Sequence, residues 1–133
     1  MEAGAHTPPE PEAVKPPSQA AEISTAVVRL MREYTGRGPT KARTTLNYDL
    51  AVVVLRDTLL KGERRLAADG HSEDVLKMRR RFQQSMRMDL IAEVERITGR
   101  RVVAFMSDNH IEPDVAAELF IFENGQTGDP VGE

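Results

Sequence analysis

The segment GRRVVAFMSDNHIEPDVAAELFIFE, residues 99–123, decides the fold that we predict from the sequence. It contains two apolar runs, residues 101–106 and 115–122, and a polar stretch between them that includes Asp, Asn, His and Pro. Apolar runs joined by such turn-forming residues are typical of a β-hairpin. The second run alternates, so its apolar side chains are expected to share one face of a strand: Val115, Ala117, Leu119 and Ile121.

The segments upstream of this hairpin predict three helices. Residues 21–35 and 72–98 carry apolar side chains at helical spacing, and a glycine follows each segment where a helix would end. Ser72 is the expected N-cap of the helix at residues 72–98. Between the two, Asp57 or Thr58 can cap a shorter helix that runs to residue 68.

One further strand completes the predicted fold. Residues 45–55, TLNYDLAVVVL, alternate at first and then become continuously apolar, which is typical of a central strand covered on both faces. The element order is therefore α-β-α-α-β-β. We predict an α+β fold with a small antiparallel three-stranded sheet and helices packed on one face. So small a sheet leaves an open edge and an exposed apolar side, and a homodimer would cover both.

Composition predicts the domain organisation and the location of the protein. Residues 1–20 hold most of the prolines and predict a disordered tail, which is followed by one domain at 21–124 and a flexible acidic tail at 125–133. The chain has no cysteine, which excludes disulfides and thiolate metal sites. It shows neither a secretory signal nor an apolar run near the ~20 residues that span a bilayer. We expect a cytoplasmic protein whose only membrane role would be peripheral, at the inner face.

The first candidate contact is the segment GRGPTKART, residues 36–44. Its glycines and cations can present N–H groups and positive charge to a phosphate or a carboxylate. The expected ligand or partner contacts are Arg37, Gly38, Lys41 and Arg43. The alternative is a positively charged turn without a ligand, because the GxxxxGK[ST] spacing of a P-loop is absent.

The second candidate contact is the polar connector SDNHIEPD, residues 107–114. We expect Asp108, Asn109, His110 and Asp114 to form a polar rim that faces the first segment. Such residues can bind a metal or transfer protons, but they also make local backbone bonds in an exposed turn. A hydrolytic zinc site needs more nitrogen ligands than one histidine, and no nucleophile-elbow, zincin or dinucleotide motif occurs. We therefore predict no catalytic residue, no metal, no cofactor and no enzymatic activity.

The predicted long helix carries the densest group of cations, Lys77, Arg79, Arg80 and Arg81. The whole chain has a net charge of −3, and its basic residues concentrate between residues 22 and 101. A basic helix face can bind nucleic acid or an anionic lipid surface. No aromatic residue is interleaved for base stacking, so a solvated or dimer-facing helix face is the alternative.

Two segments, GRGPTKARTTLNYDLAVVVLRDTLLKGE at 36–63 and ITGRRVVAFMSDNHIEPDVAAELFIFE at 97–123, resemble a family of small bacterial proteins named after MpsC. MpsC is the small soluble member of a cation-translocating, membrane-potential-generating system, and the resemblance extends over about residues 22–123. It implies a bacterial cytoplasmic protein that assists a membrane complex linked to sodium translocation or inorganic carbon uptake. It carries over no catalytic residues.

These observations lead to two functional hypotheses. The leading hypothesis is a non-enzymatic accessory or regulatory module, a homodimer that contacts a membrane ion-transport complex through the two polar segments. The alternative is a nucleic-acid or anion-binding regulatory protein that uses the basic face of the long helix. The alternative predicts binding that weakens steeply as salt rises.

Overall fold

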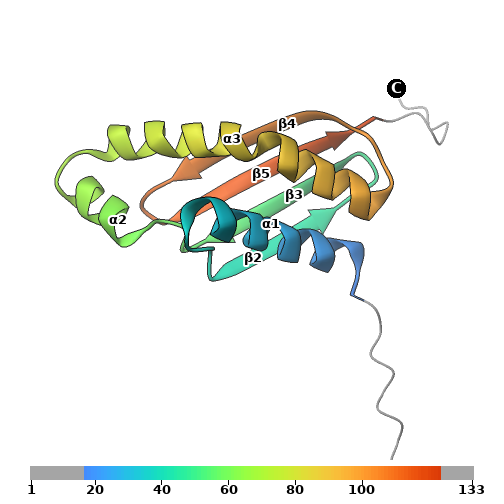
Figure 1. The fold of residues 1–133 in the computed structure, drawn as a ribbon, viewed down its shortest axis with the longest axis horizontal. Helices are drawn as coiled ribbons and strands as arrows, with labels where there is room; N and C mark the ends of the chain where they lie inside the picture. The colour runs from blue at the N-terminus through green and yellow to red at the C-terminus, as the bar shows by residue number, and fades with distance from the viewer. Residues whose placement is uncertain (1–16, 124–133) are drawn as a thin grey trace, which may run out of the picture.

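The structure, a computed structural model, describes residues 17–123, in which three helices accompany one antiparallel sheet (Figure 1). The elements are α1 Gln19–Thr35, β2 Lys41–Leu46, β3 Leu50–Arg56, α2 Lys61–Ala68, α3 Ser72–Thr98, β4 Val102–His110 and β5 Val115–Phe122. α1 and α3 cover one face of the sheet, and α2 lies beyond one end of the strands (Figure 1). The predicted tails lie outside the described residues except for 17–20, where α1 already begins at Gln19.

The α+β class and the antiparallel pairing are confirmed, but the prediction of three strands is wrong because the sheet has four. Residues 45–55, predicted as one strand, contain a turn at 47–49 that separates β2 from β3. The backbone N–H of Asn47 donates to the Leu50 carbonyl at 2.8 Å and closes this hairpin. Asn and Asp favour such turns because their side chains bond locally to the backbone. The element order is therefore α-β-β-α-α-β-β.

The two polar segments are shorter than predicted, because strands extend into both of them. Residues 41–44, expected in a loop, belong to β2, and residues 107–110, expected in the connector, belong to β4. The connector between β4 and β5 is therefore only residues 111–114, and its Glu112–Pro113 peptide bond is cis. Strand geometry now determines to which side each polar residue points.

The strands are hydrogen-bonded in the order β2-β3-β5-β4, and every neighbouring pair is antiparallel. The register places four residues in one row across the sheet: Arg43, Val54, Ala117 and Asp108. Directly opposed residues of paired strands point to the same side of a sheet. Since β2 and β4 are the two edges, Arg43 and Asp108 lie on the same face at opposite sides of the sheet.

The inner face, defined as the side that α1 and α3 cover, contains the core. Its buried sheet residues are Ala51, Val53, Leu55, Val102, Ala116, Phe120 and Phe122. The helices contribute Ile23, Val27, Leu30, Met31, Met86, Leu90 and Val94. Removing these side chains from water, at about 25 cal/mol per Å² of apolar area, is the main force that holds α1 and α3 on the sheet.

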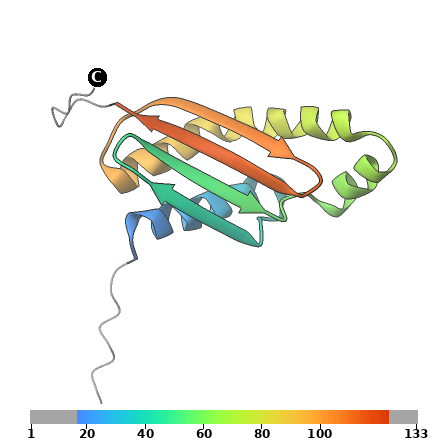
Figure 2. The same cartoon turned by 180° about the vertical axis from the view of Figure 1, so that it is seen from behind.

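The outer face, defined as the opposite side of the sheet, is covered by none of the three described helices (Figure 2). The alternate residues predicted to share one face of β5 do share one, and it is the outer face: Val115, Ala117, Leu119 and Ile121. The buried positions of β5 are those between them, which include Glu118. Alternation defines the two faces of a strand, but it does not say which face the helices cover.

Two predicted helix caps are wrong. α2 begins at Lys61, and Asp57, with a backbone φ of +60°, lies in the left-handed region four residues earlier. Thr58 is buried and bonds to the β4–β5 connector instead of capping a helix. His71 is the N-cap residue of α3, so Ser72 is its first helical residue. In the first case a long-range contact competes with the local cap, and in the second the boundary differs by a single residue.

Candidate functional site

Asp114, the last residue of the connector, fixes the segment that leads into α2. Its Oδ1 accepts hydrogen bonds from the backbone N–H of Thr58 at 3.0 Å and from the Thr58 hydroxyl at 3.1 Å. Its Oδ2 accepts from the backbone N–H of Leu59 at 3.1 Å and from Arg64 Nη2 at 3.3 Å. One carboxylate thus satisfies two consecutive backbone donors that no strand or helix partner satisfies. Asp114 thus holds the connector against the segment that leads into α2.

Asp57 lies between two arginines and completes the same network. Arg37 Nη2 donates to Asp57 Oδ2 at 2.9 Å, and its Nη1 donates to the Asp57 carbonyl at 2.9 Å. Arg64 Nη2 donates to Asp57 Oδ1. Burial raises the pKa of the Asp57 carboxyl, but hydrogen bonds from Arg64, Arg37 and Thr40 outweigh burial and hold the pKa below its ordinary value of 3.8. Arg37, expected to contact a ligand, is therefore engaged in stabilising a turn with positive φ.

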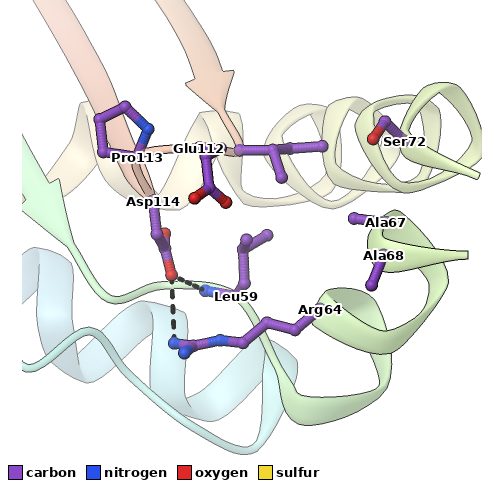
Figure 3. A pocket seen from close by; sticks show the side chains of 9 residues that line it. Leu59, Arg64, Ala67, Ala68, Ser72, Glu112, Pro113 and Asp114 are labelled. Atoms are coloured by element: carbon purple, nitrogen blue, oxygen red, sulfur yellow. Dashed lines mark hydrogen bonds and ion pairs between the residues drawn. The ribbon is translucent and has the colours of Figure 1, made fainter. Parts of the chain in front are cut away.

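A groove of about 360 Å³ lies between α2 and the connector (Figure 3). Its lining residues are Leu59, Arg64, Ala67, Ala68, Ser72, Ile111, Glu112, Pro113 and Asp114. Most of these side chains are apolar, and the paired Arg64 and Asp114 bound one side of it. Arg64 and Asp114 balance each other, which leaves the exposed Glu112 as the net charge of the lining. An apolar or cationic group fits this groove better than an anion does.

A second polar network is buried where α2, α3 and β4 meet. Arg79 Nη1 lies 2.7 Å from Glu63 Oε1, and the two side chains are only 6% and 11% exposed. Arg79 Nε also donates to Asn109 Oδ1 at 3.1 Å, and Glu63 Oε1 accepts from the Leu60 backbone N–H at 2.8 Å. A buried ion pair of this kind requires both partners, because either one alone would be a charge buried without compensation.

Glu118 on β5 is fully buried on the inner face. Its Oε2 accepts a hydrogen bond from the Ser107 hydroxyl at 3.1 Å, while Oε1 has no hydrogen-bond partner among residues 17–123. Burial raises the pKa of the Glu118 carboxyl from 4.5 to about 7, although the Ser107 hydrogen bond and the Arg79 charge act in the opposite direction.

The structure places the eight predicted contact residues in four settings. Arg37 and Asp114 belong to the network around Asp57, and Asn109 belongs to the buried network with Arg79. Four residues lie exposed on the outer face at its two edges: Lys41 and Arg43 on β2, and Asp108 and His110 on β4. Gly38 packs against α1, where an added Cβ would lie 3.1 Å from the Val28 carbonyl oxygen. The two polar segments therefore meet through Asp57 and Arg64, not through their full lengths.

The basic stretch on α3 differs from its prediction at one position. Arg79 is buried and paired with Glu63, so it is not part of a solvated cationic face. Lys77, Arg80 and Arg81 are exposed as expected. A shallow groove of about 200 Å³ beside β4 is lined by Arg80 and Arg87, together with Gln83, Gln84, Phe105 and Ser107.

Two further features are absent from residues 17–123. No group of three or more His, Asp or Glu there is arranged to hold a metal ion. No helix in that range combines the length and the apolar character needed to cross a membrane. His110, the histidine of the predicted polar rim, has its Nδ1 2.9 Å from the Pro113 carbonyl oxygen.

The fold and these contacts define a small α+β module with one uncovered sheet face and an ion-paired groove at one end of the sheet. Comparison with known families identifies it further. The family described as "Na+-translocating membrane potential-generating system (MpsC)" matches residues 18–124, and the chain belongs to this family. Comparison with curated proteins and with solved structures gives no match.

Five charged residues build these networks without having been predicted to do so: Asp57, Glu63, Arg64, Arg79 and Glu118. Asp57 was expected to cap a helix, and Arg79 was expected on a cationic helix face. One of them left a signal, because Glu118 is the single charged residue within the apolar run VAAELFIF. The buried position of Arg79 left no comparable signal, since it lies between exposed basic neighbours in a continuous cationic run.

Proposed function

We propose that this protein is a non-enzymatic accessory or regulatory module of a membrane cation-translocating system, which it contacts as a peripheral partner on the cytoplasmic side. Membership of the MpsC family carries this proposal, because the family is described by a Na+-translocating, membrane-potential-generating system. The arrangement of the acidic residues supports a binding role and not a catalytic one. Asp57 and Asp114 accept hydrogen bonds from arginines and backbone N–H groups, so these carboxylates serve to stabilise a turn.

The groove between α2 and the connector is the contact that we assign to the partner. It combines small apolar side chains with a fixed ion pair and one exposed carboxylate, Glu112. Its walls come from two segments that are clamped together by Asp114, so the groove is preformed. Preformed surfaces lose less conformational entropy on binding than mobile ones do. The expected occupant is a cytoplasmic loop that presents an apolar residue next to a cation.

The test is affinity purification of the tagged full-length chain from gently solubilised, nuclease-treated native cells, with partners identified by mass spectrometry. We expect stoichiometric recovery of a polytopic membrane transporter. Glu112→Arg reverses the charge in the groove and should abolish this recovery. Glu123→Arg makes the same change at an exposed position at the far end of β5, and it should leave recovery intact.

Other results would contradict the proposal. Recovery of the protein alone, or of ribosomal and nucleoid components, would exclude a stable transporter complex. Recovery of the transporter with Glu112→Arg, but not with Glu123→Arg, would support the function and move the contact away from the groove.

A second candidate function is anion or nucleic-acid binding by α3. The observation that favours it is the groove in which Arg80 and Arg87 stand beside polar side chains of α3 and β4. Binding of single-stranded RNA to the purified full-length protein should then weaken steeply with salt, and Arg80→Glu or Arg87→Glu should abolish it. Arg65→Glu, on the exposed surface of α2, is the matched control. Charge reversal at Arg79 would not test binding, because that side chain is buried in an ion pair.

A further inference from the structure

The outer face of the sheet carries a continuous apolar strip along its two central strands. Its members are Leu50, Val52 and Val54 of β3 and Val115, Ala117, Leu119 and Ile121 of β5. Met106 of β4, which is 51% exposed, lies beside Leu119 and widens the strip. None of the three described helices covers it (Figure 2). Soluble proteins rarely leave so large an apolar surface in contact with water unless another molecule covers it.

The charges at the edges of this strip are opposite in sign. On the β2 side lie the exposed Lys41 and Arg43, with Arg56 of β3 next to Lys41. On the β4 side lies the exposed Asp108. Arg43 and Asp108 belong to the same row of the sheet, so both lie at the same height along the strands. A surface with an apolar centre, a cationic edge and an acidic edge is complementary to a second copy of itself.

We propose that the outer face binds the outer face of a second copy of this chain, with the twofold axis parallel to the strands. A rotation about that axis lays β2 of each copy over β4 of the other, and β3 over β5. Arg43 of each copy then faces Asp108 of the other copy, and the two apolar strips meet in the middle. An axis perpendicular to the strands would instead lay the cationic β2 edge over its own copy, which like charges disfavour. The charges therefore select one of the two possible face-to-face arrangements.

The size of the face suits such an interface. Four strands ~4.8 Å apart and ~23 Å long have a flat outline of roughly 440 Å² in each copy. The two copies together would bury roughly 900 Å² or more, because side chains add relief to the flat outline, and a specific interface needs about 1,000 Å². Sheets that pack face to face with nearly aligned strands lie ~10 Å apart, which allows edge side chains to reach one another.

The test measures the mass of the full-length protein in solution by sedimentation equilibrium. We expect a dimer with twice the monomer mass of 14.8 kDa. Arg43→Asp and Asp108→Arg should each weaken dimerisation by about tenfold, because each replaces two attractive pairs with two repulsive ones. An equimolar mixture of the two single variants should dimerise again, since a mixed dimer contains an Asp opposite an Arg at both sites. The perpendicular arrangement already opposes like charges in the wild type, so it does not predict that either single variant weakens the dimer.

Arg81→Asp, on the exposed side of α3, is the matched control for the change of charge and should leave the dimer unchanged. Circular dichroism of each variant establishes that the fold is retained. A monomer at every concentration, or a dimer that neither variant weakens, would overturn the proposal. A dimer that both variants weaken but their mixture does not rescue would also overturn it. The proposal does not depend on the transporter, because it is measured on the purified protein alone.

Discussion

Glu118→Gln tests whether the sheet holds a carboxyl group that is neutral over much of the physiological pH range. Glu118 is fully buried, one of its oxygens has no partner within residues 17–123, and its pKa is raised to about 7. Glutamine has the same shape as the protonated acid and can still accept a hydrogen bond from Ser107, but it cannot ionise. The substitution therefore removes the titration while it keeps most of the packing.

The size of the effect follows from the two pKa values. The ordinary carboxyl pKa of 4.5 applies to the unfolded chain, and the native value is about 7. Each pKa unit corresponds to about 1.36 kcal/mol, so the rise is worth about 3 kcal/mol. Because the native state binds the proton more tightly, the stabilisation is present below pH 4.5 and is lost as the pH rises to about 7. Above that pH both states are ionised and the dependence ends.

The assay is urea unfolding of the wild type and of Glu118→Gln at several pH values and one protein concentration. The difference in the free energy of unfolding between variant and wild type should grow by about 3 kcal/mol in favour of glutamine between about pH 4.5 and pH 8. A constant offset from the added amide N–H groups does not change this growth. Glu123→Gln, at an exposed position, should leave the pH dependence of the wild type in place.

A difference between Glu118→Gln and the wild type that stays constant across this pH range would refute the reasoning. It would mean that water or a rearranged Arg79 solvates the carboxylate in the native state. A difference that grows in favour of the wild type would mean that ionised Glu118 is stabilised by its surroundings, which contradicts the effect of its burial.

Three other substitutions test the contacts that shape the molecule. Asp114→Ala leaves two backbone N–H groups without their acceptor and should lower the free energy of urea unfolding by about 2–3 kcal/mol; a loss near zero would show that water replaces the carboxylate. Arg79→Leu leaves Glu63 buried without its cation and should lower the free energy of unfolding by about 3–5 kcal/mol. Adding Glu63→Gln should recover most of that loss. A double variant as unstable as the single one would contradict the pairing. Gly38→Ala places a Cβ 3.1 Å from a carbonyl oxygen of α1 and should lower the thermal midpoint of unfolding by about 4 °C. Gly62→Ala, with open space around the new Cβ in α2, should raise the midpoint. Equal shifts for the two variants would show that the Gly38 segment moves freely.

Local patterns predicted the elements that depend on local interactions. The apolar periodicity of α1 and α3, and the glycines at 36 and 99 with positive φ, marked both helices correctly. The apolar runs of β4 and β5 and the turn residues between them predicted the antiparallel hairpin. The turn at residues 47–49 was missed, because Leu46, Tyr48 and Leu50 continue the alternation of a single strand across it.

The candidate site was predicted less well, because its residues come together from separate segments. Arg37 and Asp114 were selected as polar loop residues, but Asp57 and Arg64, which link them, lie in the stretch that was predicted as a short helix and its cap. Lys41 and Arg43 were grouped with Arg37, although the strand that contains them carries them to the outer face. Arg79 lies within a cationic run, and its burial depends on Glu63, sixteen residues earlier.

The sequence by itself determined the α+β class, the order of most elements, and membership of the MpsC family, because periodicity, caps and family motifs are properties of neighbouring residues. Only the tertiary structure decided which face of β5 is buried. It placed Glu118 on the inner face and the alternate residues Ala117 and Leu119 on the open side. It also decided that Arg43 and Asp108 share one row across four strands. The physical reason is the same in each case. Burial and strand register depend on segments far apart in the chain, and a local pattern fits either choice until those segments pack.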